Sequence, residues 1–137
     1  MLVRDVMTPD PVVVTPDLGV AQARALARHR GVDHLPVVHH ECLVGMLTPR
    51  ELEDGGDGAV ATATGHAARL SVVAPRRVRE LMRPAHPVVS PEQPVSSAAR
   101  LLLEERCSGA AVLDERFRVV GLLTTADLLV AGMRPER

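Results

Sequence analysis

The chain has 137 residues, a length that suits one compact domain or two small ones sharing a core. Hydrophobic residues make up 46% of it and charged residues 24%, as in ordinary soluble globular proteins. The net charge is −1, with one Phe and no Trp or Tyr. The chain therefore offers neither a basic field nor aromatic stacking groups, and nucleic acid is not expected as a partner.

The N-terminus and the cysteines indicate a cytoplasmic protein. The opening MLVRDVMTPDPVVV carries charges and prolines, unlike a signal peptide. No apolar run approaches the roughly 18 residues of a membrane span, so no membrane association is expected. Cys42 and Cys107 form no CxxC motif, which favours reduced thiols.

Hydrophobic spacing and turn residues predict the elements of the first half. In order, these are a short turn at 3–7, a strand at 12–15, a helix at 19–30, strands at 35–39 and 42–47, and a helix starting near residue 48. Thr15 and Pro16 signal a turn after the first strand, and a polar hairpin tip joins the last two strands.

The second half repeats this order. It comprises a turn at 78–82, a strand at 88–90, a helix at 94–106, strands at 110–113 and 118–123, and a helix starting near residue 124. VRDVMTPDPVVVTP at 3–16 matches VRELMRPAHPVVSP at 78–91 with a shift of 75. After 114–118 the shift is 76, so GMLTPREL at 45–52 matches GLLTTADL at 121–128.

Two copies are too few for a solenoid, so we expect a pair that closes one core. The predicted organisation is repeat 1 at 1–54, a linker at 55–76, repeat 2 at 77–132 and a tail at 133–137. Glycines and small residues indicate a loose linker, in which residues 66–73 fit a short helix or a strand equally.

Each copy begins its last helix with a Thr-x-x-acid step. One interpretation is a capping box, in which Thr124 or Thr48 caps the helix and Asp127 or Glu51 returns to the cap amide. Glu is the favoured acid there. The other interpretation is a nucleotide site, because free amides at a helix start suit phosphate and a nearby aspartate can accept bonds from a ribose diol. The local pattern leaves both open.

These pieces together resemble a tandem pair of CBS domains, the ligand-sensing unit also called a Bateman module. The resemblance rests on VRDVMTPDPVVVTP, HLPVV and GMLTPREL in the first copy, and on VRELMRP, VVSP and GLLTTADLL in the second. It implies an α/β (α+β) fold of two β-α-β-β-α repeats packed sheet to sheet about a pseudo-twofold axis. It also implies two clefts between the repeats, and often a dimer of modules.

Relatives bind adenosine-containing ligands such as AMP, ADP, ATP or S-adenosylmethionine, regulate other proteins and do no chemistry themselves. By this resemblance the first cleft would contain Thr124, Asp127, Thr15, Asp33, His34 and Leu35. Asp127 would hold the ribose and Thr124 the phosphate, while His34 stands where some relatives place a phosphate-contacting basic residue.

The second cleft would contain Thr48, Glu51, Ser90, Ser108 and Gly109. Glu51 replaces the usual Asp, and Ser108 and Gly109 supply no cation. We therefore expect at most one good site, the one at Asp127. Because few cations line that cleft, AMP or adenosine-like ligands are favoured there over ATP.

Other polar groups point to no further chemistry. The run from His39 to Cys42 resembles a metal cluster, but adjacent strand residues face opposite sides, so a hairpin tip is favoured and no metal is expected. His29, His66 and His86 are interpreted as surface residues.

Two hypotheses follow. The first is a free-standing, non-enzymatic regulatory module that senses an adenosine-containing ligand, needs no cofactor, forms a homodimer and signals to an unidentified partner protein. The alternative is a ligand-independent dimerisation or scaffold module in which both Thr-x-x-acid steps are only caps. An enzyme ranks third.

Overall fold

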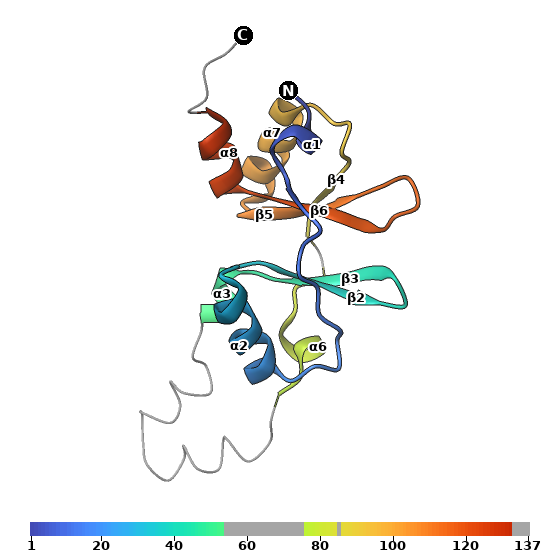
Figure 1. Cartoon of the computed structure of the whole chain (residues 1–137), viewed down its shortest axis with the longest axis vertical. Helices are drawn as coiled ribbons and strands as arrows, with labels where there is room; N and C mark the ends of the chain where they lie inside the picture. Colours follow the sequence, from blue (N-terminus) through green and yellow to red (C-terminus); the bar gives the residue numbers. More distant parts are fainter. Residues whose placement is uncertain (54–75, 85, 133–137) are drawn as a thin grey trace.

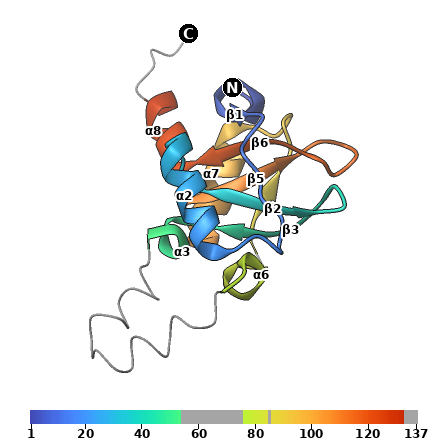
Figure 2. The ribbon, with the colours of Figure 1, turned by 60° about the horizontal axis from the view of Figure 1, so that its bottom comes forward.

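The computed structural model describes residues 1–53, 76–84 and 86–132. Two sheets pack against each other, with helices on their outer sides (Figures 1 and 2). Most of the predicted linker and all of the predicted tail lie outside the described residues, as does the choice between helix and strand at 66–73. Among the described residues, no helix has the length and apolar character needed to cross a membrane.

The first layer contains α2 (Val20–Arg30), β2 (Leu35–His39), β3 (Cys42–Leu47) and α3 (Pro49–Glu53). The two strands form an antiparallel hairpin, with Leu35 opposite Leu47. Of the strand predicted at 12–15, the structure keeps a parallel bridge between Val14 and Val37. The hairpin tip turns through His40 and Glu41, both at positive φ.

The second layer contains β4 (Val88–Val89), α7 (Val95–Glu105), β5 (Gly109–Leu113), β6 (Val119–Thr124) and α8 (Thr125–Gly132). β4 runs parallel to β5, and β5 pairs antiparallel with β6, with Gly109 opposite Thr124. The predicted helix and strand bounds lie within one residue of the observed ones, with two exceptions. The strand predicted at 12–15 is reduced to the Val14 bridge, and the short strand at Thr8–Pro9 was not predicted.

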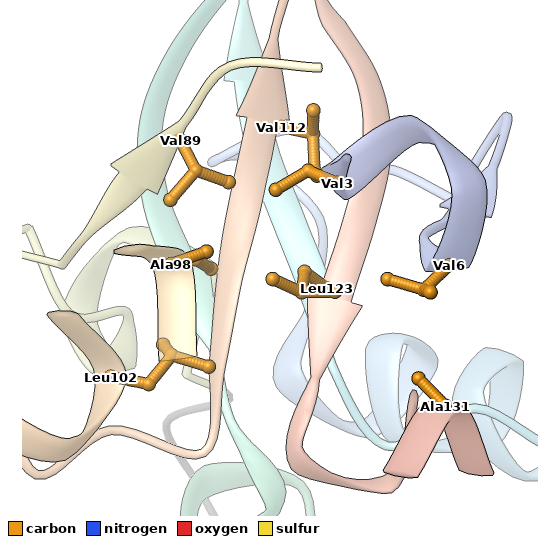
Figure 3. Packing of buried hydrophobic residues seen from close by; sticks show 9 residues of the cluster. Val3, Val6, Val89, Ala98, Leu102, Val112, Leu123 and Ala131 are labelled. Atoms are coloured by element: carbon orange, nitrogen blue, oxygen red, sulfur yellow. The ribbon is translucent and has the colours of Figure 1, made fainter. Parts of the chain in front are cut away.

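The opening segment of each sequence repeat packs in the other layer. In the first repeat, α1 (Val3–Val6) enters the core of the second layer, and β1 (Thr8–Pro9) pairs with β6. In the second repeat, α6 (Val78–Leu81) enters the core of the first layer. Figure 3 shows Val3 and Val6 pointing from α1 among the side chains of the second layer. The sequence pattern did not predict this exchange.

The exchange ties the layers together through backbone hydrogen bonds as well as apolar contacts. The amides of Val3 and Arg4 donate to the turn after β4, at the carbonyls of Gln93 and Pro91. Between the sheets, Met46, Ala111 and Leu122 form a separate buried cluster. Neither layer therefore has a complete core without the other half of the chain.

Candidate functional site

The Thr48–Glu51 step begins α3 and is a buried, charged junction. Glu51 is only 8% exposed. One carboxylate oxygen accepts hydrogen bonds from the Thr48 amide (2.7 Å) and hydroxyl (2.6 Å), and the other is 3.0 Å from Arg83 Nε. Burial raises the pKa of Glu51, but the bonds from Thr48 and Arg83 outweigh it, so the pKa lies below its ordinary value.

The Thr124–Asp127 step begins α8 and forms the more complete capping box. Asp127 Oδ2 accepts the Thr124 amide (2.9 Å) and hydroxyl (3.2 Å), and the Asp127 amide donates back to Thr124 Oγ1 (3.2 Å). The Thr8 hydroxyl donates to Asp127 Oδ1 at 3.3 Å. In both steps the acid accepts the cap amide, as the capping interpretation predicts, and the Thr124 step also has the reciprocal bond to the threonine hydroxyl.

Thr8 and Arg83 occupy equivalent positions of the repeat, since they differ by the shift of 75. Each follows a short exchanged helix, and each contacts the acid of the opposite layer. The backbone of Arg83 is fixed as well, because its N–H and C=O both bond to Met46 on β3. At this equivalent position, the acid of one layer therefore contacts a neutral hydroxyl and the acid of the other layer contacts a guanidinium.

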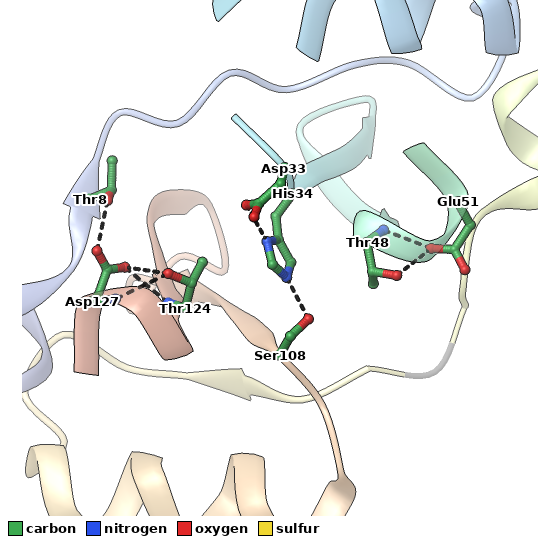
Figure 4. A network of polar contacts seen from close by, with 8 residues as sticks. All are labelled: Thr8, Asp33, His34, Thr48, Glu51, Ser108, Thr124 and Asp127. Atoms are coloured by element: carbon green, nitrogen blue, oxygen red, sulfur yellow. Dashed lines mark hydrogen bonds and ion pairs between the residues drawn. The ribbon is translucent and has the colours of Figure 1, made fainter. Parts of the chain in front are cut away.

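His34 lies between the two steps (Figure 4). Its side chain is buried, with Nδ1 2.9 Å from Asp33 Oδ1 and Nε2 2.8 Å from Ser108 Oγ. The Asp33 carboxylate only accepts, so Nδ1 donates to it, while the Ser108 hydroxyl can pair with Nε2 as donor or as acceptor. A phosphate contact, which the resemblance implied for His34, would require the ring to leave both partners.

Gly109 is needed where it stands. A Cβ there would lie 2.8 Å from His34 Cδ2 and Nε2, closer than real side chains approach. His34 and Gly109 are equivalent positions of the repeat, so a large residue on one side is accommodated by the smallest on the other. Asp33 and His34 were expected in the first cleft, and Ser108 and Gly109 in the second. The structure brings all four into one group of contacts.

A cavity of about 310 Å³ opens beside the Thr48 step. Its lining comprises Met46, Thr48, Pro49, Arg50, Arg83, His86, Arg106, Cys107, Ser108 and Gly109. Thr48, Ser108 and Gly109 were expected together in the second cleft; Glu51 and Ser90, expected there as well, are not among the lining residues. The volume is at the lower end of small-molecule pockets.

The charge of this cavity is one-sided. Three arginines are among its lining residues, Arg50, Arg83 and Arg106, and no Asp or Glu is. Within the described residues, Arg50 and Arg106 form no ion pair. His86, expected at the surface, is instead half-buried. Burial lowers its pKa despite the opposing Pro87 carbonyl, which favours the uncharged ring at neutral pH.

Arg106 reaches the cavity from a strained position. It ends α7 with φ 56°, in the left-handed region, while the equivalent end of α2 is Gly31 at φ 67°. Glycine adopts this conformation freely and arginine does not. The chain thus holds a cation at this cavity where a glycine would fit the backbone better.

Three expected site residues are placed elsewhere. The Leu35 side chain lies in the core of the first layer, so only its backbone could contact a ligand. Thr15 and Ser90 are exposed at turns that receive the exchanged helices α6 and α1. Thr15 therefore lies at a turn that contacts α6 of the first layer, whereas Asp127 lies in α8 of the second layer.

The CBS domain family profile matches residues 3–54 and 78–134. The chain is a tandem CBS-domain protein. The family assignment and the mixed α/β fold of two repeats are therefore confirmed. The CBS pair is 30% identical over 132 residues to inosine-5'-monophosphate dehydrogenase of Mycobacterium tuberculosis, covering 94% of this chain and 22% of the dehydrogenase. The chain thus spans about a fifth of that relative.

Two solved CBS pairs have the same fold. One is CBSX2 of Arabidopsis thaliana in complex with AMP, with a TM-score of 0.75, 29% identity and 96% of each chain covered. The other is the CBS domain pair of protein MJ0100 in complex with 5'-methylthioadenosine and S-adenosyl-L-methionine. Its TM-score is 0.75 and its identity 25%, with 96% of this chain and 99% of that chain covered.

Sequence reasoning missed the cations of this CBS pair. Arg50, Arg83 and Arg106 come from a helix start, an exchanged segment and a helix end. One signal was available, because aligning the two copies places Arg83 opposite Thr8 and Arg106 opposite Gly31. Within the described residues, no group of three or more His, Cys, Asp or Glu side chains could hold a metal ion.

Proposed function

We propose that this CBS pair is a regulatory sensor that binds an adenosine-containing ligand with phosphate groups in the cavity beside Thr48. The supporting observation is the lining, which includes three arginines and no acidic residue. A guanidinium binds phosphate oxygens through two parallel hydrogen bonds, and several of them around one cavity favour an anion.

The ligand class follows from charge. AMP, ADP and ATP carry negative phosphates, whereas S-adenosylmethionine carries a positive sulfonium that the arginines would repel. We therefore place phosphate-bearing nucleotides ahead of S-adenosylmethionine for this cavity. The ring of His86, whose pKa is lowered by burial, offers the base a flat neighbour.

The Asp127 cleft stays a prediction as a second site. A ribose there would compete with the Thr124 and Thr8 hydroxyls for the Asp127 oxygens. At Glu51 the equivalent competition is with Thr48 and Arg83. A phosphate beside Arg83 would compete with Glu51 for the same guanidinium. Binding of the ligand would then shift the segment that carries Arg83, and a partner protein could detect this shift.

The fully used carboxylates also support the alternative, a ligand-independent scaffold in which both acids only cap helices. Calorimetric titration separates the two. We expect AMP, ADP or ATP to bind nucleotide-free protein, and Arg106→Ala to weaken binding at least about tenfold, which corresponds to about 1.4 kcal/mol. Arg116→Ala, an exposed arginine at the β5–β6 hairpin tip, is the matched control and should bind like the natural chain.

The absorption spectrum must be recorded first, because a nucleotide retained during purification would hide binding. Without Trp or Tyr, the protein itself absorbs almost nothing near 260–280 nm, an order-of-magnitude expectation from its side chains. A stoichiometric peak near 260 nm would support the sensor, and mass spectrometry of the released compound would identify it. A flat spectrum followed by no binding of any of the four ligands would favour the scaffold.

A further inference from the structure

A larger groove adjoins the cavity beside Thr48. Its volume is about 820 Å³, and residues of β3, β4, α7 and β5 contribute to its lining. Arg83, His86 and Cys107 line both the cavity and the groove. The two spaces therefore share a border at these three residues, and a ligand longer than the cavity would continue into the groove.

The groove differs from the cavity in its chemistry. Beyond the border its lining is mainly apolar and includes Leu43, Val88, Leu101, Leu113 and Phe117. Among the described residues, the lining holds no arginine other than Arg83, and its one acid, Glu105, is exposed. The groove thus favours methyl and methylene groups, and it supplies no further guanidinium for a phosphate.

Phe117 is fixed in an exposed position on this groove. It is the only Phe, Trp or Tyr of the chain, and it is 72% exposed. Its backbone is left-handed, with φ 64°, which is uncommon for a bulky residue. The hairpin turn holds it there, because the Phe117 amide donates to the Asp114 carbonyl at 2.8 Å. An exposed aromatic ring on an apolar groove, held by a strained backbone, favours a binding surface.

Arg83 determines which part of a ligand would lie at the border. Its side chain is 45% exposed, so a phosphate can reach it from solvent. If the phosphates lie there and the nucleoside fills the cavity, any group attached beyond the phosphates extends into the groove. A simple mononucleotide would leave the groove unoccupied, although the groove has more than twice the volume of the cavity.

Building on the proposed function, we propose that the ligand is a nucleotide whose diphosphate carries a long, uncharged and largely apolar arm. The nucleoside occupies the cavity beside Thr48, the diphosphate lies at Arg83, and the arm extends along the groove to Phe117. Coenzyme A and its acyl esters have this chemistry, since a pantetheine arm of methyl, methylene and amide groups is joined to the diphosphate of adenosine.

Calorimetric titration of nucleotide-free protein under reducing conditions tests the arm. Dephospho-coenzyme A and ADP-ribose contain the same adenosine diphosphate with the same charge, and they differ only in the arm, which is pantetheine in one and a polar ribose in the other. We expect dephospho-coenzyme A to bind at least about tenfold more tightly, because its arm buries apolar groups in the groove. ADP, which has no arm, serves as the third ligand.

The place of the arm is tested by Phe117→Ser, which removes the aromatic ring from the groove. We expect this variant to weaken binding of dephospho-coenzyme A at least about fivefold. Leu103→Ser is the matched control, since Leu103 is 81% exposed and lines neither the groove nor the cavity, and it should bind like the natural chain. Circular dichroism should show both variants folded.

The outcomes separate this inference from the function on which it rests. Binding of ADP together with equal affinities for dephospho-coenzyme A and ADP-ribose would overturn the arm and leave the nucleotide sensor intact. An unchanged affinity of Phe117→Ser for dephospho-coenzyme A would overturn the placement of the arm in the groove. Failure of all three ligands to bind, ADP included, would overturn both proposals.

Discussion

The two Thr-x-x-acid steps start equivalent helices, yet their surroundings differ in charge and strain. Asp127 accepts hydrogen bonds from the hydroxyls of Thr124 and Thr8, and both donors are neutral. Glu51 is buried against Arg83 and adjoins a cavity that Arg50 and Arg106 also line. In a duplicated sequence, one copy of a motif can thus serve only as a helix cap while the other copy becomes part of a charged cavity wall. The tests below are ordered from the largest expected effect to the smallest.

The contact between the two steps is tested by Gly109→Ala. The added Cβ would meet the His34 ring at 2.8 Å, and the ring is held by Asp33 and Ser108. We expect a loss of roughly 2–3 kcal/mol of unfolding free energy, measured by urea denaturation. Gly132→Ala is the control, because a Cβ there meets nothing within 4 Å. Equal losses in both variants would show that His34 is not a rigid centre.

The difference between the exchanged segments is tested by Arg83→Ala and Thr8→Ala. Removing Arg83 leaves the buried Glu51 carboxylate without its charged partner, which should cost about 1.5 kcal/mol after allowing for solvent at the half-exposed guanidinium. Removing Thr8 deletes one long, exposed hydrogen bond and should cost about 0.5 kcal/mol or less. If thermal denaturation ranks the variants in the opposite order, the two junctions do not differ as described.

Acid should act on Glu51. Because its pKa is lowered in the folded protein, the unfolded chain binds more protons as the pH falls through the ordinary glutamate range. The stability that Glu51 contributes is therefore present at neutral pH and lost as the pH drops from that range to the lowered folded pKa. The gap in melting temperature between the natural chain and Glu51→Gln should be widest near pH 7 and shrink toward acid. A gap that widens on acidification would contradict this sign.

Arg106 is expected to lower the stability of the protein while it strengthens nucleotide binding. Arg106→Gly relieves the left-handed backbone and should raise the unfolding free energy by about 0.5–1 kcal/mol, while weakening nucleotide binding. Arg106→Ala removes the same charge but keeps the strain, so it should weaken binding without the gain. A destabilised Arg106→Gly variant would mean that the arginine side chain makes contacts that offset its backbone strain.

The sequence predicted most of the fold because its two copies carry the same local signals. The helix periods at 19–30 and 94–106 and the strand pair at 35–47 depend on neighbours along the chain, and all appear as expected. The exchange of α1 and α6 was not predictable, because both carry the same short apolar pattern and fit either core. Pattern alone does not state which copy receives which helix.

The site was less predictable for a related reason. Thr48 and Ser108 were expected together and line one cavity, but His34 and Gly109, expected in separate clefts, are in contact. The cations come from positions 50, 83 and 106, which have no common spacing and meet only after the exchange. Residues that converge through long-range packing leave no local periodic signal.

A crystal structure of the complex with AMP or ATP tests the central claim most directly. The proposed site predicts density for the nucleotide in the cavity beside Thr48, with its phosphate oxygens within hydrogen-bond distance of Arg83 or Arg106. Density at the Thr124–Asp127 step with an empty arginine-lined cavity would contradict the choice of site. No bound nucleotide at millimolar concentration would contradict the sensor itself.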